Sequence, residues 1–324
     1  MLGPRWIRSW TLLLGLAMGV AASTAMAAFP EKAIRLIVPF APGGGTDLIA
    51  RTLGNLMSRD LGKPIVVDNK PGGGTIIGTD AAAKSAPDGY TIVMATFAHA
   101  INPSLQPRLP FDNAKDFAPI ILIGRGPNVL VVRADSPYRG INDVIAAAKA
   151  NPGKLTYASQ GVGTSAHLAG ELFANLAQVR LTHVPYRGAG PALADLLGGQ
   201  VDMVFGTAAA VSSFIDAGKL RALGVTSAER SPALETVPPI AETVPGYVVE
   251  SWYGLYAPAG TPADVIARLN AAAAKAARTE EFRKRAEGEG LAVTAGSPQE
   301  FDAYVRAEEA RWRTIVRENN IKPE

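Results

Sequence analysis

Residues 34–47 read IRLIVPFAPGGGTD, a short apolar run that ends in a glycine-rich turn. The β-branched run Ile34–Val38 is typical of a strand. Apolar residues from Thr46 to Leu61 recur with helical spacing, so a helix is predicted directly after the turn. Strand, glycine turn and helix in this order are the first part of a β-α-β unit.

A second copy of this arrangement lies in the other half of the chain. Residues 155–159 (LTYAS) predict a strand, 161–165 (GVGTS) a glycine turn, and 165–177 a helix. Further short strands and Ala- and Leu-rich helices alternate from residue 65 to residue 225, with Ile120–Gly124 and Val129–Val132 predicted as separate strands. The alternation predicts an α/β fold of mostly parallel sheets flanked by helices.

The C-terminal third carries signals of local structure. Ser297-Pro298-Gln299-Glu300 has the capping-box pattern, which predicts the start of a helix. Residues 227–246 contain four prolines and are long for a connection inside one compact domain. They are interpreted either as a crossover between two lobes or as a loose surface loop, and the sequence does not decide between these.

The first residues have the features of a secretory signal peptide. Arg5 and Arg8 precede an apolar run, Trp10–Ala22, and small residues follow it up to Ala27. The run is shorter than the roughly 20 residues that span a bilayer. We therefore expect cleavage after Ala27, with residues 28–324 exported as a soluble protein.

Composition excludes several classes of function. The absence of cysteine removes disulfides, thiol catalysis, Cys-ligated metals and a lipid-anchored Cys. The formal net charge of +3 includes the two cations of the signal peptide, which leaves +1 for the exported chain. No block of Lys and Arg is interleaved with aromatic residues, so nucleic-acid binding is not expected.

The two glycine turns together predict an anion site. Glycine lets backbone amides approach a ligand closely, and the helix that follows offers free N–H groups and a partial positive charge. A tight turn also needs glycine for steric reasons, but two such turns in separate halves favour an anion between them. Neither turn has the Gly-Lys-Ser/Thr ending of a triphosphate loop, so a carboxylate is favoured over phosphate.

Enzyme chemistry finds less support in the sequence. Residues 161–166 fit the loose dinucleotide pattern, but residues 179–183 (VRLTH) lack the acidic residue expected about 20 positions on. No nucleophile elbow is present, and the three histidines lack the spacing of a metal pair. No metal or cofactor is expected, and an NAD-dependent enzyme is the weaker alternative to a binding protein.

Several polar residues at strand ends have both a ligand-binding and a structural interpretation. His99 and His167 sit where strands meet a cleft, whereas His183 is more simply a half-buried strand residue. Asp47 is more simply a helix-capping residue, although it is kept as a candidate. Arg187 can hold a second carboxylate in bidentate fashion or be a solvated surface residue.

Ten short motifs, in order, resemble a known family. They are PFAPGG at 39–44, PGGG at 71–74, APDGYT at 86–91, INP at 101–103, NPGKL at 151–155, HLAGELF at 167–173, VPY at 184–186, DLLGGQV at 195–201, GKLRAL at 218–223 and APAGTP at 257–262. The family is that of the substrate-binding proteins of tripartite tricarboxylate transporters, also called Bug or TctC-like proteins. The resemblance covers nearly the whole exported chain.

This resemblance implies a periplasmic Venus-flytrap fold of two α/β lobes joined by crossing strands. We expect residues 28–126 and 253–324 in lobe 1 and residues 127–252 in lobe 2. The ligand would be a small carboxylate (a di- or tricarboxylate, an acidic amino acid or an aromatic carboxylate) held by loop amides and ordered water. The partners would be the membrane components of the transporter or a sensor kinase, and the protein would be a monomer.

The candidate ligand-binding residues follow from the strand ends and from the family's motifs. They are Pro42, Gly43, Gly44, Gly45, Thr46, Asp47, Thr96, His99, Ser159, Gly163, Thr164, Ser165, His167, Tyr186, Arg187, Gly206 and Thr207. Two positions depart from the family: Gly206-Thr207 replaces a polar or acidic residue, and Phe97 replaces a small one. Phe97 would either stack on an aromatic ligand or fill the core.

Overall fold

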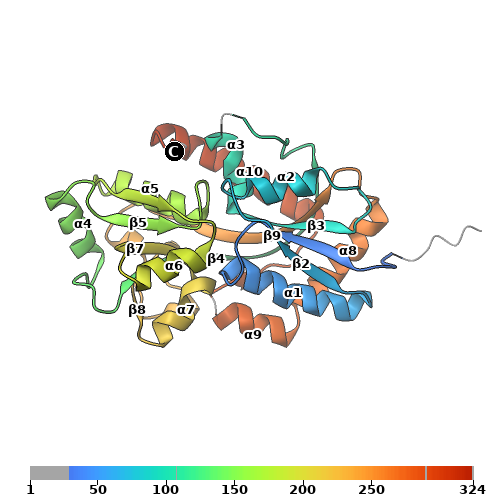
Figure 1. Cartoon of the computed structure of the whole chain (residues 1–324), viewed down its shortest axis with the longest axis horizontal. Helices are drawn as coiled ribbons and strands as arrows, with labels where there is room; N and C mark the ends of the chain where they lie inside the picture. Colours follow the sequence, from blue (N-terminus) through green and yellow to red (C-terminus); the bar gives the residue numbers. More distant parts are fainter. Residues whose placement is uncertain (1–28, 107, 289, 323–324) are drawn as a thin grey trace, which may run out of the picture.

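One long strand, β4 (Phe117–Arg133), is shared by both halves of the molecule, as the computed structural model shows (Figure 1). The structure describes residues 29–106, 108–288 and 290–322, so the predicted signal peptide lies outside it. Residues up to Pro127 pair with β9, and from Asn128 onward the strand pairs with β7 and β8. The prediction of two separate strands was therefore wrong. Gly124, Gly126 and Pro127 interrupt the apolar pattern, but antiparallel pairing keeps the backbone extended.

The sheet of lobe 1 has the order β2-β1-β3-β9-β4, with β10 also paired to β4. Its strands are β1 (Ile34–Val38), β2 (Ile65–Asn69), β3 (Thr91–Thr96), β9 (Glu250–Pro258) and β10 (Ala292–Val293). Strands β1, β2 and β3 are parallel, whereas β9 is antiparallel to its neighbours. The helices of this lobe are α1 (Gly45–Leu61), α2 (Ile76–Ala83), α3 (Phe97–Leu105), α8 (Ala263–Ala277), α9 (Glu280–Gly288) and α10 (Pro298–Glu318).

The sheet of lobe 2 has β4 at its antiparallel side. Its other strands are β5 (Thr156–Ser159), β6 (Thr182–Pro185), β7 (Met203–Thr207) and β8 (Leu220–Val225). Strands β6, β5 and β7 are parallel, and β4 runs antiparallel to both β7 and β8. The helices are α4 (Ile141–Ala150), α5 (Ser165–Leu176), α6 (Ala189–Leu197) and α7 (Ala208–Asp216). This two-lobed α/β architecture confirms the predicted fold class.

Alternating side chains of β1 explain why helices cover both faces of its sheet. Ile34, Leu36 and Val38 point to the face covered by α1 and α8, whereas Ile37 joins the core on the opposite face. That second core extends into lobe 2 and includes Trp312 of α10, which packs edge-on against Phe97 at 4.8 Å between ring centroids. Phe97 is therefore a core residue, the simpler of the two interpretations.

Residues 227–246 are packed rather than loose. Two short 3₁₀ turns, Pro232–Leu234 and Ile240–Glu242, bury apolar side chains against lobe 2. The chain then returns toward lobe 1 at Val249, whose amide donates to the Thr226 carbonyl at 2.8 Å. The loose-loop interpretation was wrong, and the crossing to β9 occurs only at the end of this segment.

The predicted capping box at the start of α10 is confirmed. The Glu300 amide donates to Ser297 Oγ at 3.2 Å, and the Ser297 amide donates to Glu300 Oε2 at 2.7 Å. Both bonds satisfy backbone or side-chain groups at the helix terminus and fix where α10 begins. Local sequence therefore determines the start of this helix.

The two lobes touch through backbone at glycine positions. The Ala41 amide of lobe 1 donates to the Arg187 carbonyl of lobe 2 at 3.0 Å. A Cβ added at Gly74 would lie 2.0 Å from the Val162 carbonyl oxygen, and one added at Gly44 would lie 3.4 Å from Ala189 Cβ. These approaches leave no room for a larger residue at Gly74 while the lobes are in contact.

We expect Gly74→Ala to prevent this contact, because its Cβ would collide with lobe 2. Overpacking costs about 1–3 kcal/mol, which corresponds to a roughly tenfold loss of the contacting form. Gly44→Cys with Ala189→Cys provides a reporter in a chain without other thiols, since their Cβ spacing suits a disulfide. Oxidation of this pair should be about tenfold slower with Gly74→Ala.

Gly73→Ala is the matched control. Its φ of 59° is equal within a degree to the 58° of Gly74, so both substitutions carry the same backbone strain. A Cβ at Gly73 meets only Ile76 and Ile77 of its own lobe, at 3.5 Å or more. Equal oxidation rates in the two backgrounds would contradict the steric argument.

Candidate functional site

Helices of both lobes begin at strand ends that face one another. Helix α3 follows β3 directly and α7 follows β7 directly, whereas α1 and α5 follow the two glycine turns. A Cβ at Gly45, the first residue of α1, would lie 2.8 Å from Thr207 Oγ1 at the start of α7. One at Gly163, ahead of α5, would lie 2.6 Å from Asn102 Oδ1 in α3. The structure thus brings the two predicted glycine turns to one interface between the lobes.

Three of these helices lack a side-chain cap. Gly44, Thr96 and Thr207 stand at the N-cap positions of α1, α3 and α7, and none makes a side-chain cap bond. The first amides of each helix have no acceptor inside the helix, so their N–H groups and the positive helix end remain available. Helix α5 differs, since Thr164 Oγ1 accepts from the His167 amide. An acceptor placed between these helix ends would meet several neutral donors.

Asn128 lies at the point where β4 passes from one sheet to the other, and sequence reasoning missed it. It is fully buried and stands opposite Thr207 in the β4–β7 register. Its Oδ1 accepts from Ser165 Oγ at 3.2 Å, whereas its Nδ2 has no hydrogen-bond partner among the described residues. A buried unpaired donor costs about 1–3 kcal/mol, so this amide is ready to donate to a ligand. The feature of the sequence that could have indicated this residue is its position directly before the apolar run 129–132.

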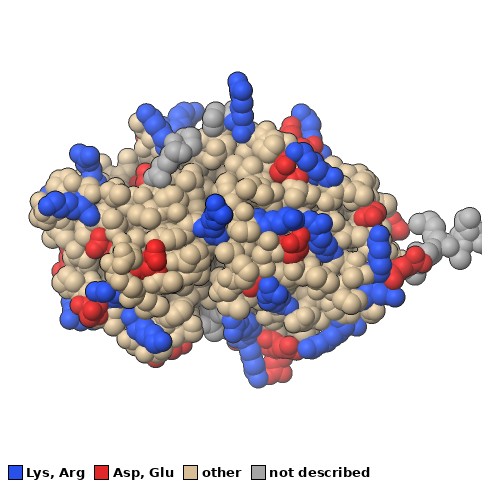
Figure 2. All heavy atoms as spheres, viewed as in Figure 1, with Lys and Arg blue, Asp and Glu red and all other residues tan. Residues whose placement is uncertain are grey.

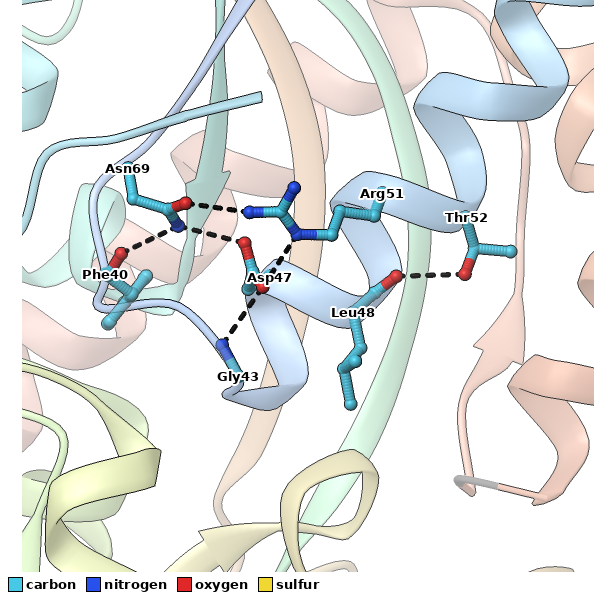
Figure 3. A network of polar contacts seen from close by, with 7 residues as sticks. All are labelled: Phe40, Gly43, Asp47, Leu48, Arg51, Thr52 and Asn69. Atoms are coloured by element: carbon cyan, nitrogen blue, oxygen red, sulfur yellow. Dashed lines mark hydrogen bonds and ion pairs between the residues drawn. The ribbon is translucent and has the colours of Figure 1, made fainter. Parts of the chain in front are cut away.

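Asp47 fixes the first glycine turn (Figure 3). Its Oδ2 accepts from the Gly43 amide at 3.0 Å and from Arg51 Nε at 2.9 Å. Its Oδ1 accepts from Asn69 Nδ2 at 2.9 Å, and the same Asn69 group donates to the Phe40 carbonyl at 3.0 Å. Asp47 therefore holds Gly43 directly and Phe40 through Asn69. Asp47 is a positioning residue in this arrangement, as the simpler interpretation of the sequence held.

These bonds also determine the charge of Asp47. Burial alone would raise its pKa, but the hydrogen bonds from Arg51, Gly43 and Asn69 outweigh burial and lower the pKa below its ordinary value near 3.8. The carboxylate is therefore ionised at neutral pH while it accepts from three donors. Its charge is compensated inside the turn and does not confront a bound anion directly.

The second glycine turn is fixed by hydroxyl and imidazole groups. The Gly161 amide donates to Ser159 Oγ at 3.0 Å, and Ser159 Oγ lies 2.6 Å from His183 Nε2. The Gly163 amide donates to His167 Nδ1 at 3.2 Å. The rings of His167 and His183 stack at 4.5 Å between centroids. Ser159, His167 and His183 thus hold the backbone that precedes α5.

Burial keeps both imidazoles neutral. Desolvation, aided by the neighbouring His183, lowers the pKa of His167 to about 3, and desolvation lowers the pKa of His183 to about 4. Neutrality matters at His167, because only an unprotonated Nδ1 can accept from the Gly163 amide. The glycine turn in lobe 2 therefore keeps these hydrogen bonds only while the two rings are uncharged.

A pocket of about 460 Å³ opens beside the turns, with walls from both lobes. Its lining residues are Pro39, Pro71, Gly72, Gly73, Gly74, Thr75, Ile76, Ile77 and Gln106 from lobe 1, and Gln160, Gly161, Val162, Pro185, Tyr186 and Arg187 from lobe 2. Tyr186 and Arg187 were predicted site residues. The loop 71–77 and the two glutamines were missed, because amide side chains and a glycine loop carry little signal alone.

The hydroxyl of Tyr186 is held by a hydrogen bond and stays protonated. It donates to Asp195 Oδ2 at 2.6 Å, in the following helix α6. Desolvation and this bond to Asp195 raise the pKa of Tyr186 to about 12, so it stays a neutral phenol. The bond fixes the ring that forms part of the pocket wall.

Two of the predicted site residues have a packing role in the structure. His99 is buried in lobe 1, where its ring stacks on Tyr256 at 4.7 Å and meets Phe117 edge-on at 5.1 Å. A Cβ at Gly206 would lie 2.4 Å from Val211 Cγ1, so glycine there is a steric requirement of the β7–α7 turn. Both residues have a packing role in the structure, and their assignment to ligand binding stays a prediction.

The Asp47 contacts predict a loss of stability that a surface pair does not share. Asp47→Asn places an NH₂ group among donors, so the free energy of unfolding should fall by about 1–3 kcal/mol at pH 7 in urea titrations. Asp302→Asn is the matched control, since Asp302 and Arg306 have the same i,i+4 spacing and a 2.8 Å bond to Nε but are exposed. Its effect should stay below about 0.5 kcal/mol. Equal losses of unfolding free energy in the two variants would contradict the stabilising role of the Asp47 contacts.

The histidine stack predicts acid lability. Unfolded His167 takes up a proton near pH 6.5 whereas the folded form resists protonation down to about 3, so unfolding is favoured as the pH falls between these values. His167→Asn keeps an acceptor without this titration. It should reduce the pH slope of the unfolding free energy by up to about 1.4 kcal/mol per unit below pH 6. Above pH 7.5 the unfolding free energies of the wild type and of His167→Asn should change with pH in parallel. Parallel curves over the whole pH range would contradict the lowered pKa of His167.

Within the described residues, no cluster of three or more His, Cys, Asp or Glu side chains is arranged to hold a metal ion. None of the helices in that part of the chain is both long and apolar enough to cross a membrane. On the face shown in Figure 2, Lys and Arg side chains are spread over both lobes and interspersed with Asp and Glu.

Comparison with known proteins shows which family has this architecture. Residues 49–321 match the family model of the tripartite tricarboxylate transporter family receptors, TctC. A UPF0065 protein of Pseudomonas sp. (strain P51) is 42% identical over 96% of this chain and 94% of its own.

Two solved structures of similar proteins contain carboxylates. Rpa4515 of R. palustris with adipate is 36% identical, with a TM-score of 0.88 over 91% of this chain and 100% of its own. MatC of Rhodopseudomonas palustris with bound malate is 33% identical, with a TM-score of 0.85 over 89% and 100%. The matched family consists of receptors and not of enzymes, which sets aside the dinucleotide-dependent alternative. The chain belongs to the tripartite tricarboxylate transporter family of periplasmic receptors.

Proposed function

We propose that this protein captures a small carboxylate between its lobes in the periplasm and presents it to the membrane components of a tripartite tricarboxylate transporter. The proposal includes cleavage of the signal peptide after Ala27. It also places residues 28–126 and 253–324 in lobe 1 and residues 127–252 in lobe 2. Receptor and transporter would meet only after the lobes have come together around the ligand.

The unpaired amide of Asn128 is the observation that carries the proposal. This buried donor lies beside Ser165 and Thr207, at the beginnings of α5 and α7. The uncapped ends of α1 and α7 meet at the same interface. A carboxylate would satisfy donors from both lobes at once, so its binding would favour contact between them.

The chemistry of these donors favours a carboxylate over a phosphate ester. They are backbone amides, hydroxyls and one side-chain amide, and neither glycine turn contains Lys or Arg. Phosphate-binding loops commonly add a cation to offset a second negative charge. The adipate and malate bound by the two similar proteins support the same class of ligand here.

Thermal unfolding with a ligand panel tests the function. The protein would be expressed with its own N-terminus, purified from the periplasm and refolded to remove carried ligand. The panel contains succinate, malate, adipate, citrate, glutamate, benzoate, inorganic phosphate and NAD. A carboxylate at about 1,000 times its Kd adds roughly 4 kcal/mol, which raises Tm by about 8–16 °C. A rise in Tm with phosphate or NAD alone would count against carboxylate capture. An unchanged Tm with every member of the panel would count against it as well.

Asn128→Asp sharpens this test, because it keeps the acceptor for Ser165 and replaces the NH₂ donor with a carboxylate oxygen that also repels a bound anion. We expect the Kd of the best carboxylate to rise by at least about 10- to 100-fold, since the lost hydrogen bond to a charged group is itself worth about 1.5–3 kcal/mol. Asn142→Asp, at an exposed position of α4, is the control and should bind as the wild type does. Unchanged affinity in Asn128→Asp would remove this residue from the site.

A further inference from the structure

We propose that Asn102 is a positioning residue for lobe closure, because it holds the loop 71–75 of lobe 1 in a strained conformation that fits the glycine turn of lobe 2. It acts through Gly74 and Thr75, and none of these residues has to touch the ligand. The inference rests on the proposed function, since closure around a carboxylate is what this contact would serve. Its first test uses protein without ligand, so the two proposals can fail separately.

Three consecutive residues of the turn in lobe 2 lie against this part of lobe 1. A Cβ added at Gly161 would lie 3.6 Å from Gly74 Cα, and the carbonyl of Val162 leaves no room for a Cβ at Gly74. A Cβ added at Gly163 would lie 2.6 Å from Asn102 Oδ1. The turn that precedes α5 is therefore seated on two residues of lobe 1.

The loop that carries Gly74 has a strained backbone. Gly72, Gly73 and Gly74 have φ values of 125°, 59° and 58°, and Thr75 continues the series at 81°. Glycine adopts positive φ readily, whereas a β-branched residue is strained there. Such strain persists only where the surrounding structure imposes it. The preference of Thr75 alone would therefore move the loop out of this conformation.

Asn102 supplies contacts that hold the loop. Its Nδ2 donates to the Gly74 carbonyl at 3.2 Å and to Thr75 Oγ1 at 3.3 Å. Asn102 and Thr75 are 1% and 4% exposed, so water does not compete for these bonds. A carbonyl oxygen can only accept, so the NH₂ group faces the loop and the side-chain oxygen faces Gly163. One amide thus ties the loop of lobe 1 to the place where lobe 2 meets it.

The energetic cost of this arrangement points to a role beyond packing. Asn102 Oδ1 has no hydrogen-bond partner among the described residues. An apolar residue would fill the same space without a buried, unpaired acceptor, and glycine at position 75 would remove the strain. Both costs are explained if the amide and the threonine hydroxyl are needed to hold the loop in position for closure.

Oxidation of the Gly44→Cys and Ala189→Cys pair in the absence of ligand tests the inference. Asn102→Ala should slow oxidation about tenfold, because Thr75 then relaxes to negative φ and carries Gly74 away from lobe 2. Adding Thr75→Gly to Asn102→Ala should bring the rate back to within about threefold of the wild type, because glycine adopts the loop conformation unaided. A loss caused only by the cavity at residue 102 would not be reversed in this way.

Gln178→Gly is the matched control. Gln178 is an exposed non-glycine residue with a φ of 54°, and it follows the opposite end of α5 from the glycine turn. Adding Gln178→Gly to Asn102→Ala removes the same kind of strain elsewhere and should leave the slow rate unchanged. Equal recovery with Gln178→Gly, no recovery with Thr75→Gly, or an unchanged rate in Asn102→Ala would each overturn the inference.

Thr75→Val tests the same contact if Tm values show that Asn102→Ala does not fold. Valine keeps the β-branched shape but cannot accept from Asn102, so oxidation should slow about threefold or more. Thr75→Gly alone should stay within about twofold of the wild-type rate. Equal rates for Thr75→Val and the wild type would overturn the inference.

The link to ligand capture has its own measurement. With the best carboxylate of the panel, Asn102→Ala should raise the Kd by up to the factor by which it slows oxidation, because fewer molecules are competent to close. A Kd equal to that of the wild type, together with slow oxidation, would overturn the role of Asn102 in capture. If no carboxylate binds the wild type, the proposed function fails while the oxidation rates still decide whether Asn102 positions the loop.

Discussion

The antiparallel pairing of one strand, β4, with partners in both sheets is the constraint on which the site depends. Its first part pairs with β9, and from Asn128 onward it pairs with β7 and β8. Because the strand is continuous, the ends of the parallel strands in the two lobes must face each other across the point where it changes partners. Asn128 lies at that point, so the same pairing that joins the lobes also places a donor between them.

Both glycine turns face this interface, but different side chains hold them. In lobe 1 an ionised carboxylate, Asp47, accepts from the turn and from Arg51. In lobe 2 a hydroxyl and two neutral imidazoles do the corresponding work. Glycine gives the backbone its close approach, and these buried side chains remove the freedom that glycine would otherwise leave. A preorganised turn loses less entropy when the ligand binds.

Electrostatics is divided between the depth and the mouth of the interface. The inner donors are neutral amides and hydroxyls, which attract a carboxylate without the desolvation cost of a buried cation. The guanidinium of Arg187 lies at the exposed mouth, where its hydration is retained in part.

The sequence by itself determined the α/β class, the two glycine turns and the capping box of α10, because these depend on local spacing and on residues close in the chain. It also indicated the family, through short motifs spread along the chain. Only the tertiary structure decided that 120–124 and 129–132 are one strand and that His99 packs against Phe117 and Tyr256. Asn128, Gln106 and Gln160 also emerged only there. Each of these depends on partners distant in sequence, and the position of Asn128 before an apolar run does not show that the fold pairs its side-chain oxygen and leaves its nitrogen without a partner.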